Sequence, residues 1–514
     1  MFSKVKSCAV HGVDGRMIDV EADVNDGLPV FTMVGYLSSS VREASERVRT
    51  ALKNSGFHLP PKRITINLSP ADMRKDGSGY DLAIAAAVLL SLGITAELPM
   101  NQMLVLGELS LDGSVKAIPG VLPMVICARE EGMTGCIVPK ENVQEAALVQ
   151  GISVIGVSSL QETMEYIQGI KEIAHTNVTQ PAGEASEYMY DIDFSDVVGQ
   201  ESIKRGMEIA AAGFHNVLLT GAAGAGKSML AKRLPTILPR MSFEESLEVT
   251  KIYSVGGMLP PEGGLIHRRP FRAPHHTISE YALIGGGRVP TPGEVSFAHY
   301  GVLFLDELPE FSKPVLEVLR QPLEDRRIRI SRVQASYEFP ADFMFVAAMN
   351  PCPCGNYLDY RKCSCTEQQI RRYQSKVSGP LLDRIDIRME VKGVKQEALF
   401  SKQKTESSKT IRTRVEQARQ MQKERFAGTG LLFNSQLDGK NLEEYITLSE
   451  EGKRLVLQLF EEQQLSVRGV HRVLKLARTI ADLAGSEEIG YVHLQEAAFY
   501  RNQDVFAKEV LYGN

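Results

Sequence analysis

The sequence predicts an α/β protein in three parts: an α+β amino-terminal domain, a central αβα core with a phosphate-binding loop (a P-loop), and a helical carboxyl-terminal domain. Three observations support this prediction. Short apolar runs alternate with helical stretches before about residue 394, as in sheets covered by helices. A glycine-rich loop at 221–228 stands between a strand and a helix. Beyond about residue 395 the apolar residues repeat with a helical period.

Size and composition limit the possible functions. A chain of 514 residues exceeds one hydrophobic core, so about three domains are expected. Its 43% hydrophobic and 24% charged residues are typical of a soluble globular protein. The net charge of −5 excludes a uniformly basic nucleic-acid-binding protein, so any contact with DNA or RNA must be a local patch.

Location and cysteine use follow from the same composition. The sequence has no run of about 18 apolar residues, so no membrane partner is expected. Its first residues carry no apolar signal core, and the expected location is the cytoplasm. Seven cysteines in a cytosolic chain favour free thiols or metal ligands over disulfides.

The amino-terminal domain is predicted from short strands mixed with helices. Residues 62–68 alternate like a strand, and 81–92 are apolar almost throughout, like a buried helix. Residues 135–139 and 154–157 have the form of short parallel strands between helices. The predicted divisions are an amino-terminal domain at 1–172, a polar linker at 173–190, the core at 191–394 and the helical domain at 395–514.

The glycine-rich loop predicts a site for a nucleoside triphosphate. Its glycines let backbone N–H groups face a polyphosphate, and the following helix N-terminus adds positive charge. Lys227 can reach the outer phosphates, and Ser228 can bind Mg²⁺. An ordinary glycine-rich turn would leave the lysine and serine unexplained. The loop consists of Gly221, Ala222, Ala223, Gly224, Ala225, Gly226, Lys227 and Ser228.

Two further strands end in polar side chains that suit the same site. Residues 301–305 form a continuous apolar run followed by Asp306 and Glu307. We expect Asp306 to hold the Mg²⁺ and Glu307 to act as the base; the alternative is an acidic strand cap. Residues 345–349 lead into Asn350, which can orient the attacking water or contact the γ-phosphate, or else form a turn before proline.

Four cysteines form a candidate metal site. Their spacing is C-x-C-x8-C-x-C, and four thiolates suit tetrahedral Zn²⁺. We expect a structural zinc, because four protein ligands leave no open position; free thiols are the alternative. The four are Cys352, Cys354, Cys363 and Cys365. Cys8, Cys127 and Cys136 are expected in the core.

An arginine-rich segment at 324–333 predicts a cationic hairpin. Basic and apolar residues alternate, so one face of the hairpin is expected to be positively charged. Such a face can hold DNA phosphates, although a solvated charged hairpin explains the pattern as well. The arginines are Arg326, Arg327, Arg329 and Arg332.

Taken together, these motifs resemble AAA+ ATPases, specifically the magnesium-chelatase-like branch. The resemblance rests on residues 196–200, the phosphate loop, 305–307, Asn350 and 379–386, in that order. It implies ATP as the nucleotide and a hexameric ring. It places Val198, Gly199 and Gln200 near the adenine and makes Asn350 the sensor 1 residue. It makes Arg384 an arginine finger acting in a neighbouring subunit, and Arg468 the sensor 2 arginine; surface salt bridges are the alternative for both.

The same resemblance gives a role to the segment between the nucleotide motifs. Residues 271–288 are similar to the helix-2 insert of the chelatase and MCM-helicase branch, and flexible glycines beside Arg288 suit a loop that contacts DNA in a pore. His275 and His276 invite a metal site. Adjacent histidines without other spaced ligands are more typical of turns and hydrogen bonds.

The amino-terminal domain resembles the proteolytic domain of Lon proteases, an S5-like fold. The resemblance rests on residues 74–82 and 106–113. Gly79 occupies the slot of the nucleophilic serine, and Leu122 occupies that of the catalytic lysine. Ser78 lies one place early. Without a nucleophile or base no covalent route exists, so the domain is expected to be an inactive protease fold.

The whole arrangement resembles the YifB/ComM family. The resemblance implies a ring-forming ATPase that moves along DNA, as a branch-migration helicase in natural transformation or recombination. The fold alone does not imply that the protein acts on DNA. Two alternatives remain: a metal-insertion motor of the chelatase type, and a protein-remodelling ring.

Overall fold

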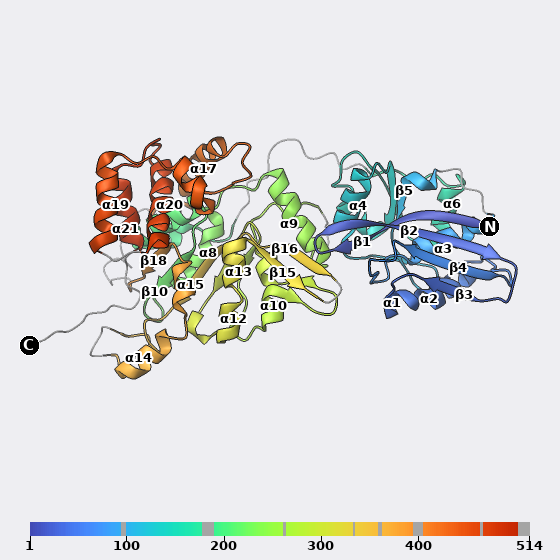
Figure 1. The fold of residues 1–514 in the computed structure, drawn as a ribbon, viewed down its shortest axis with the longest axis horizontal. Coiled ribbons are helices and arrows are strands. Elements are labelled where there is room, and N and C mark those ends of the chain that lie inside the picture. Colours follow the sequence, from blue (N-terminus) through green and yellow to red (C-terminus); the bar gives the residue numbers. More distant parts are fainter. Residues whose placement is uncertain are drawn as a thin grey trace, which may run out of the picture.

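The computed structural model describes residues 1–93, 99–176, 190–260, 264–332, 335–357, 362–393, 405–462 and 466–501. The described chain is elongated, with an amino-terminal sheet at one end, a second sheet in the middle and a group of helices at the other end (Figure 1). Its two larger sheets have seven and five strands.

The amino-terminal sheet mixes antiparallel and parallel pairing, in the order β3-β4-β2-β1-β5-β8-β9. β1 and β2 form a long antiparallel hairpin, while β5, β8 and β9 run parallel to β1 or to each other. Its strands are β1 (Phe2–His11), β2 (Asp14–Asn25), β3 (Phe31–Val34), β4 (Arg63–Ser69), β5 (Met103–Val105), β8 (Gly135–Pro139) and β9 (Ser153–Val157); β6 (Glu108–Leu109) and β7 (Val115–Lys116) form a separate pair.

One helix of this domain, α3, is buried along almost its whole length and packs on β1 and β2. It is apolar on all sides, and such a helix belongs in a core. The helices are α1 (Ser39–Arg42), α2 (Ala44–Asn54), α3 (Asp81–Ser91), α4 (Val121–Glu130), α5 (Val143–Ala146) and α6 (Leu160–Ile167). The strands and helix predicted at 62–68, 81–92, 135–139 and 154–157 are therefore confirmed.

The central sheet is wholly parallel, in the order β11-β14-β17-β10-β18. Its inner strands are buried on both faces, which explains their unbroken apolar sequences. The strands are β10 (Val217–Thr220), β11 (Phe271–Arg272), β14 (Val302–Leu305), β17 (Met344–Met349) and β18 (Ile387–Glu390). The predicted α/β fold with a parallel core is confirmed.

Helices and two small hairpins surround the central sheet. The helices are α7 (Glu201–Gly213), α8 (Lys227–Arg233), α9 (Phe243–Val255), α10 (Glu280–Ile284), α11 (Glu294–Phe297), α12 (Lys313–Glu317), α13 (Arg320–Asp325), α14 (Glu367–Gln374) and α15 (Gly379–Asp383). The hairpins are β12 (Gly285–Gly286) with β13 (Thr291–Pro292), and β15 (Arg327–Ser331) with β16 (Ser336–Pro340).

The carboxyl-terminal part is helical, as predicted, and packs on the core. Arg472 on α20 makes an ion pair of 2.8 Å with Asp386, just before β18. Asp386 is buried; burial opposes ionisation, but His215, whose Nδ1 lies 3.6 Å from the carboxylate, and the charge of Arg472 lower its pKa overall. This pair fixes the helices against the amino edge of the central sheet. The helices are α17 (Ser408–Arg425), α18 (Gly439–Tyr445), α19 (Glu450–Glu462), α20 (Val467–Leu483) and α21 (Tyr491–Arg501).

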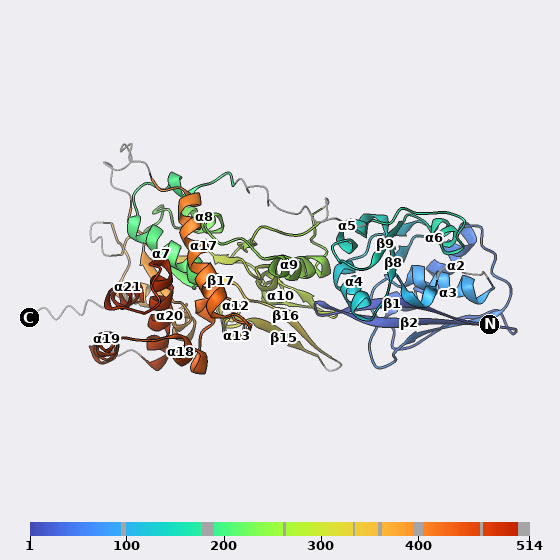
Figure 2. The same cartoon turned by 90° about the horizontal axis from the view of Figure 1, so that it is seen from above.

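The amino-terminal domain contacts the core at two places. Beside α9, Gly120 N donates to Ser254 O at 3.0 Å, and the Ser254 hydroxyl donates to the buried Glu145 carboxylate. Burial raises the pKa of Glu145. At the second place the β1–β2 turn meets the β15–β16 hairpin, where His11 and Tyr337 stack with ring centroids 4.5 Å apart (Figure 2).

Parts of the predicted organisation lie outside the described residues. These include most of the linker at 173–190 and the start of the helical domain at 395–404. The domain boundaries therefore stay predictions. Within the described residues no helix is long and apolar enough to cross a membrane.

Candidate nucleotide site and nucleic-acid contacts

The phosphate loop connects β10 to α8 at the carboxyl edge of the central sheet. Gly224 and Gly226 have φ of 76° and 93°, the left-handed region that glycine adopts without strain. Gly221 is required for a different reason. A Cβ atom there would lie 2.2 Å from the carbonyl oxygen of Val391, at the end of the neighbouring strand β18. The glycines thus fix the shape of the loop, as the sequence predicted.

Lys227 is folded back over the loop that precedes it. Its Nζ donates to Gly221 O at 2.7 Å, to Ala222 O at 2.8 Å and to Asn350 Oδ1 at 3.0 Å. Burial lowers the pKa of the ammonium, and the carboxylates of Asp306 and Glu307 oppose that shift. The structure therefore brings Lys227 and Asn350 together, and these contacts can be exchanged for phosphate oxygens.

Ser228 and Asp306 supply two oxygens at one point. The Ser228 hydroxyl donates to Asp306 Oδ2 at 2.5 Å. Adjacent ligands of an octahedral Mg²⁺ lie about 3 Å apart, so this pair fits the ion with a small relaxation. Glu307 follows in the left-handed region, with φ of 52°, and its side chain is exposed. A glutamate in the left-handed region carries about 1 kcal/mol of backbone strain. Because the side chain is exposed, its carboxylate can contact water.

The segment expected near the adenine reaches the same edge of the sheet. The Gln200 side chain donates to Lys392 O, and the preceding residue Val391 packs on Gly221. Gln200 itself has φ of 63°, and Gly199 has φ of 66°. This turn, together with Val198, therefore lies beside the start of the phosphate loop.

Arg384 lies at the opposite edge of the sheet. Thr220, which leads into the phosphate loop, pairs with Glu390 at the carboxyl end of β18, whereas Arg384 precedes the amino end of that strand at Ile387. Because the strands are parallel, the length of β10, about 10 Å, separates the two edges. Arg384 is therefore remote from the phosphate loop of its own chain.

Arg384 and Arg468 line one cavity. It has a volume of about 440 Å³ and lies between the central sheet and the carboxyl-terminal helices. Arg468 is in the first turn of α20, whose amino end is capped by the Ser466 hydroxyl accepting from Gly469 N at 3.1 Å. Arg472 and Lys475 line the same cavity. Arg384 and Arg468, both predicted to contact a nucleotide, thus lie together and away from the phosphate loop of their own chain.

The four cysteine sulfurs converge directly after Asn350 and Pro351. All four Sγ atoms lie within 4.8 Å of one another, and three Sγ–Sγ distances are 3.4, 3.6 and 3.9 Å. A tetrahedral zinc with Zn–S bonds of about 2.3 Å requires edges of about 3.8 Å. The cluster therefore fits Zn²⁺. Its members are Cys352, Cys354, Cys363 and Cys365.

The cysteine cluster also contacts the phosphate loop. Gly355 has φ of 79°, and a Cβ atom there would lie 3.2 Å from Ala223 N in the loop. Gln374 on α14 donates to Pro351 O at 3.2 Å from the other side. Of the remaining cysteines, Cys8 and Cys136 are buried as expected, while Cys127 is only half-buried.

The predicted cationic hairpin forms, but it carries three of the four arginines. Arg327 and Arg329 are exposed on one face of β15, and both pair with Glu338 on β16, at 2.8 and 2.9 Å. Arg326 ends α13 with φ of 54° and turns away; it donates to Ser435 O and lines the cavity of Arg384. The expectation that Arg326 shares the hairpin face is wrong, because the helix cap rotates it out of the strand alternation.

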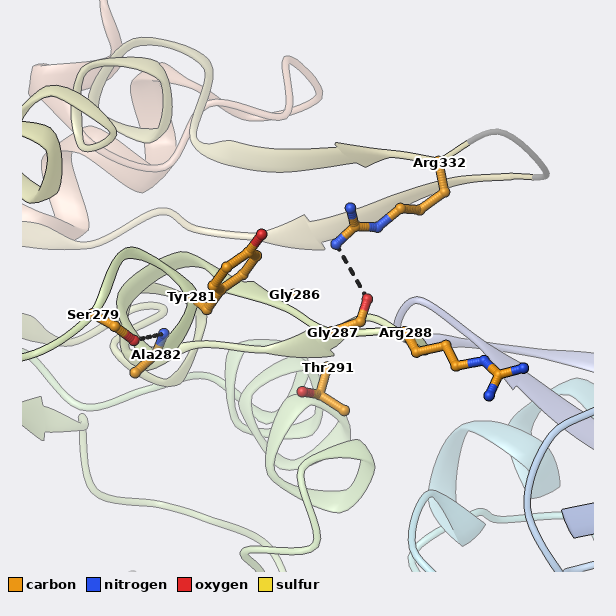
Figure 3. A pocket seen from close by; sticks show the side chains of 8 residues that line it. All are labelled: Ser279, Tyr281, Ala282, Gly286, Gly287, Arg288, Thr291 and Arg332. Carbon is orange, nitrogen blue, oxygen red and sulfur yellow. Dashed lines mark hydrogen bonds between the residues drawn. The ribbon is translucent and has the colours of Figure 1, made fainter. Parts of the chain in front are cut away.

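Arg332 and Arg288 both line an open pocket of about 800 Å³, where the Arg332 side chain reaches back toward Gly287 and the Arg288 side chain extends the other way (Figure 3). Arg332 donates to Gly287 O at 3.2 Å, which joins the β15–β16 hairpin to the β12–β13 hairpin. Within the described residues neither arginine has an ion-pair partner, and no carboxylate lines this pocket. The predicted loop and hairpin arginines therefore share this pocket. Both also line a second pocket of about 680 Å³ beside carboxylates of the amino-terminal domain, namely Asp14, Asp72, Asp76, Glu130 and Glu131.

The two histidines show no metal-binding geometry. Their rings stack on each other at 4.0 Å, and His275 Nδ1 lies 3.0 Å from the Thr277 hydroxyl. In the described parts of the chain, the cysteine cluster is the group found with metal-ligand geometry. His275 and His276 therefore act in a turn.

The two positions that correspond to the Lon nucleophilic serine and catalytic lysine hold neither residue. Gly79 packs against Ile118: a Cβ atom at residue 79 would lie 3.0 Å from the Ile118 side chain. Leu122 is buried in α4. The Ser78 hydroxyl instead donates to the Glu108 carboxylate. Sequence analysis missed one important partner in the core: Glu324 on α13, which makes an ion pair with Arg384. The sequence around Glu324 gave no indication that this residue pairs with Arg384.

Comparison with known proteins agrees with this geometry. Residues 193–399 match the family described as magnesium chelatase, subunit ChlI, and residues 405–501 match the carboxyl-terminal part of that subunit. Residues 20–142 match the family described as subunit ChlI of Mg-chelatase.

Full-length relatives are similar over nearly the whole chain. YifB of Escherichia coli is 41% identical over 504 residues, which cover 98% of this chain and 97% of that protein. Competence protein ComM of Haemophilus influenzae is 40% identical over 501 residues, covering 97% of each chain. Lon protease 2 of Bacillus subtilis is 31% identical over 183 residues, covering 32% of each chain.

Replacing Lys227 tests the nucleotide site directly. We expect Lys227→Ala to reduce ATP affinity at least ~100-fold, because the outer phosphates lose their charged partner at the loop. Binding of a fluorescent ATP analogue measures this. Lys232→Ala, on the last turn of the same helix, serves as the matched control and should bind normally. Normal nucleotide affinity in Lys227→Ala would contradict the site.

Proposed function

The chain belongs to the YifB/ComM family of magnesium-chelatase-like AAA+ ATPases, and we propose that it forms a ring, a hexamer, that couples ATP hydrolysis to movement along DNA. Branch migration in transformation or recombination, in the cytoplasm, is the activity that its relation to ComM supports. One observation supports the proposal of a ring: the phosphate loop and Arg384 lie at opposite edges of the same sheet. Each site is completed by a second copy.

In the proposed mechanism, the nucleotide is held by the chain that supplies the loop. Lys227 and the loop N–H groups bind its phosphates, and Asn350 orients the attacking water. Glu307 accepts the proton of that water. Mg²⁺, bound by Ser228 and Asp306, would neutralise charge on the phosphate oxygens.

The neighbouring chain supplies the arginines. Arg384 and Arg468 line one cavity at the edge remote from their own loop, so both are proposed to contact the nucleotide of the adjacent subunit. An arginine supplied in trans stabilises the charge that develops on the transferred phosphoryl group. Hydrolysis then depends on how adjacent subunits are arranged, which is how a ring can convert it into movement.

Nucleic-acid binding is proposed for the two hairpins beside the core. Arg288 and Arg332 line one pocket beside the hairpins, with carboxylates of the amino-terminal domain in the next pocket. Arg327 and Arg329 are exposed along β15 and share the single acid Glu338, which leaves a net positive charge on this face. Such an arrangement suits phosphate contacts that are independent of base sequence. The amino-terminal domain is proposed to be an inactive Lon-like fold, because Gly79 and Leu122 occupy the slots of the nucleophile and base.

The cysteine cluster is proposed to hold one structural Zn²⁺. Four sulfurs at tetrahedral separations leave no position for a substrate. The bound metal would fix the turn after Asn350, which packs on the phosphate loop through Gly355.

The magnesium-chelatase matches also support an alternative function, a motor for metal insertion.

Dependence of the ATPase rate on DNA distinguishes the helicase from the metal-insertion motor. We expect forked or four-way DNA to raise the ATPase rate several-fold, and Arg327→Ala with Arg329→Ala to weaken DNA binding and reduce the slope of log affinity against log salt by about 2. Arg371→Ala, which removes an exposed ion-paired arginine on α14, is the matched control. An ATPase rate that is the same with and without DNA would exclude the helicase function.

Zinc content tests the cysteine cluster. Purified protein should carry about one zinc per chain, and Cys354→Ser should lose it, because three thiolates hold the ion far less tightly. Elemental analysis measures the ratio, and Co²⁺ substitution should give the absorption of a tetrahedral thiolate site. Cys127→Ser, outside the cluster, should keep the metal. A folded wild-type chain free of metal would end the proposal.

Mixing two defective chains tests the shared site. Glu307→Gln lacks the base and Arg384→Ala lacks the finger, so each alone should be inactive. Random rings of the two place an intact finger beside an intact base at about one interface in four, so about a quarter of the wild-type rate should return. Steady-state ATPase of equimolar mixtures measures this. No recovery, with both chains still assembling, would refute a site shared between subunits.

A further inference from the structure

Arg384 is held in the cavity in an unusual way. Only 7% of the residue is exposed. Its Nη1 donates to Pro380 O at 2.6 Å, and its Nη2 makes an ion pair with the Glu324 carboxylate. Its Nε is buried and has no hydrogen-bond partner among the described residues. A buried donor without a partner is unfavourable, so the guanidinium is not fully satisfied in the single chain.

Two other carboxylates around the cavity pair with other arginines. Asp386 pairs with Arg472 at 2.8 Å, and Asp342 lies 3.6 Å from Arg326. Glu324 is the acid that pairs with the second side of the Arg384 guanidinium. Two fixed contacts on a planar group determine its orientation, so the partner of Nη2 sets the direction in which the guanidinium faces.

Glu324 also lies close in sequence to the cationic hairpin. It is in the last turn of α13, and that helix is capped by the left-handed residue Arg326. Strand β15 begins at the next residue, Arg327. Because the connection is so short, a displacement of the hairpin must move the last turn of α13 as well. Glu324 therefore joins the proposed DNA-binding face to the finger.

We propose that Glu324 is a positioning residue: it orients Arg384 toward the nucleotide of the neighbouring subunit and transmits the position of the β15–β16 hairpin to that finger. The inference rests on the shared site proposed above. It identifies the path by which DNA contact at the hairpin raises ATP turnover. Glu324 itself does not touch the nucleotide.

Kinetics of Glu324 variants test this role. Glu324→Ala should lower the DNA-stimulated kcat about 100-fold, because a displaced finger no longer meets the transferred phosphoryl group. The KM for ATP should stay within about twofold, since ATP binds on the other edge of the chain. Affinity for a labelled single-stranded oligonucleotide should also stay within about twofold. Glu324→Gln keeps an acceptor of the same shape and should lose less activity.

A mixing experiment separates positioning from a general structural role. Glu324→Ala mixed with Glu307→Gln should recover activity as Arg384→Ala does, because the Glu307→Gln chain lends an intact finger. Asp325→Ala, the adjacent acid on α13, is the matched control and should keep the wild-type kcat.

Each outcome decides one point. A normal kcat in Glu324→Ala, or a loss that the mixture does not repair, overturns the role of Glu324 while recovery with Arg384→Ala still supports the shared site. If Arg384→Ala fails to recover as well, both proposals fall. If Glu324→Ala does not assemble, the isosteric Glu324→Gln provides the same readouts.

Discussion

The direction of the parallel strands is the constraint on which the rest of the site depends. Parallel pairing places the end of β10, the end of β14 and the end of β17 at one edge, so Lys227, Asp306 and Asn350 meet there. The same pairing places the start of β18, with Arg384 before it, at the other edge. No rotation of side chains closes that gap. The proposal that a second copy supplies the arginine rests on this separation.

Much of the nucleotide site was predictable, because the phosphate loop, Asp306 and Asn350 each follow directly on a buried apolar strand. The strand before the phosphate loop and the strand before Asp306 have sequences that no exposed segment would carry, and the polar residues after them lie at one edge by topology alone. The spacing of the cysteines also predicted their convergence. Both predictions depend on local sequence and on the strand direction, and neither depends on long-range packing.

Other features were not predictable, because they depend on contacts between distant segments. Arg326 follows the alternation of the hairpin in sequence, yet a left-handed helix cap turns it toward the carboxyl-terminal helices. The pairing of Arg384 with Glu324 joins residues far apart in the sequence through one cavity, and the contact of Gly355 with Ala223 joins the cysteine turn to the loop. Docking of the amino-terminal domain on α9 had no sequence signal either.

These distant contacts converge on the β15–β16 hairpin. On one side the β1–β2 turn reaches it so closely that a Cβ atom at Gly12 would lie 2.8 Å from Glu338 O. At its base Arg326 binds Ser435 O of the carboxyl-terminal part, and α13 carries Glu324 to the finger. An element held by three parts of the chain cannot shift without altering all three. The amino-terminal domain therefore braces β16, and in the proposed function this contact sets the position from which the hairpin, and through it Arg384, would respond to a bound strand.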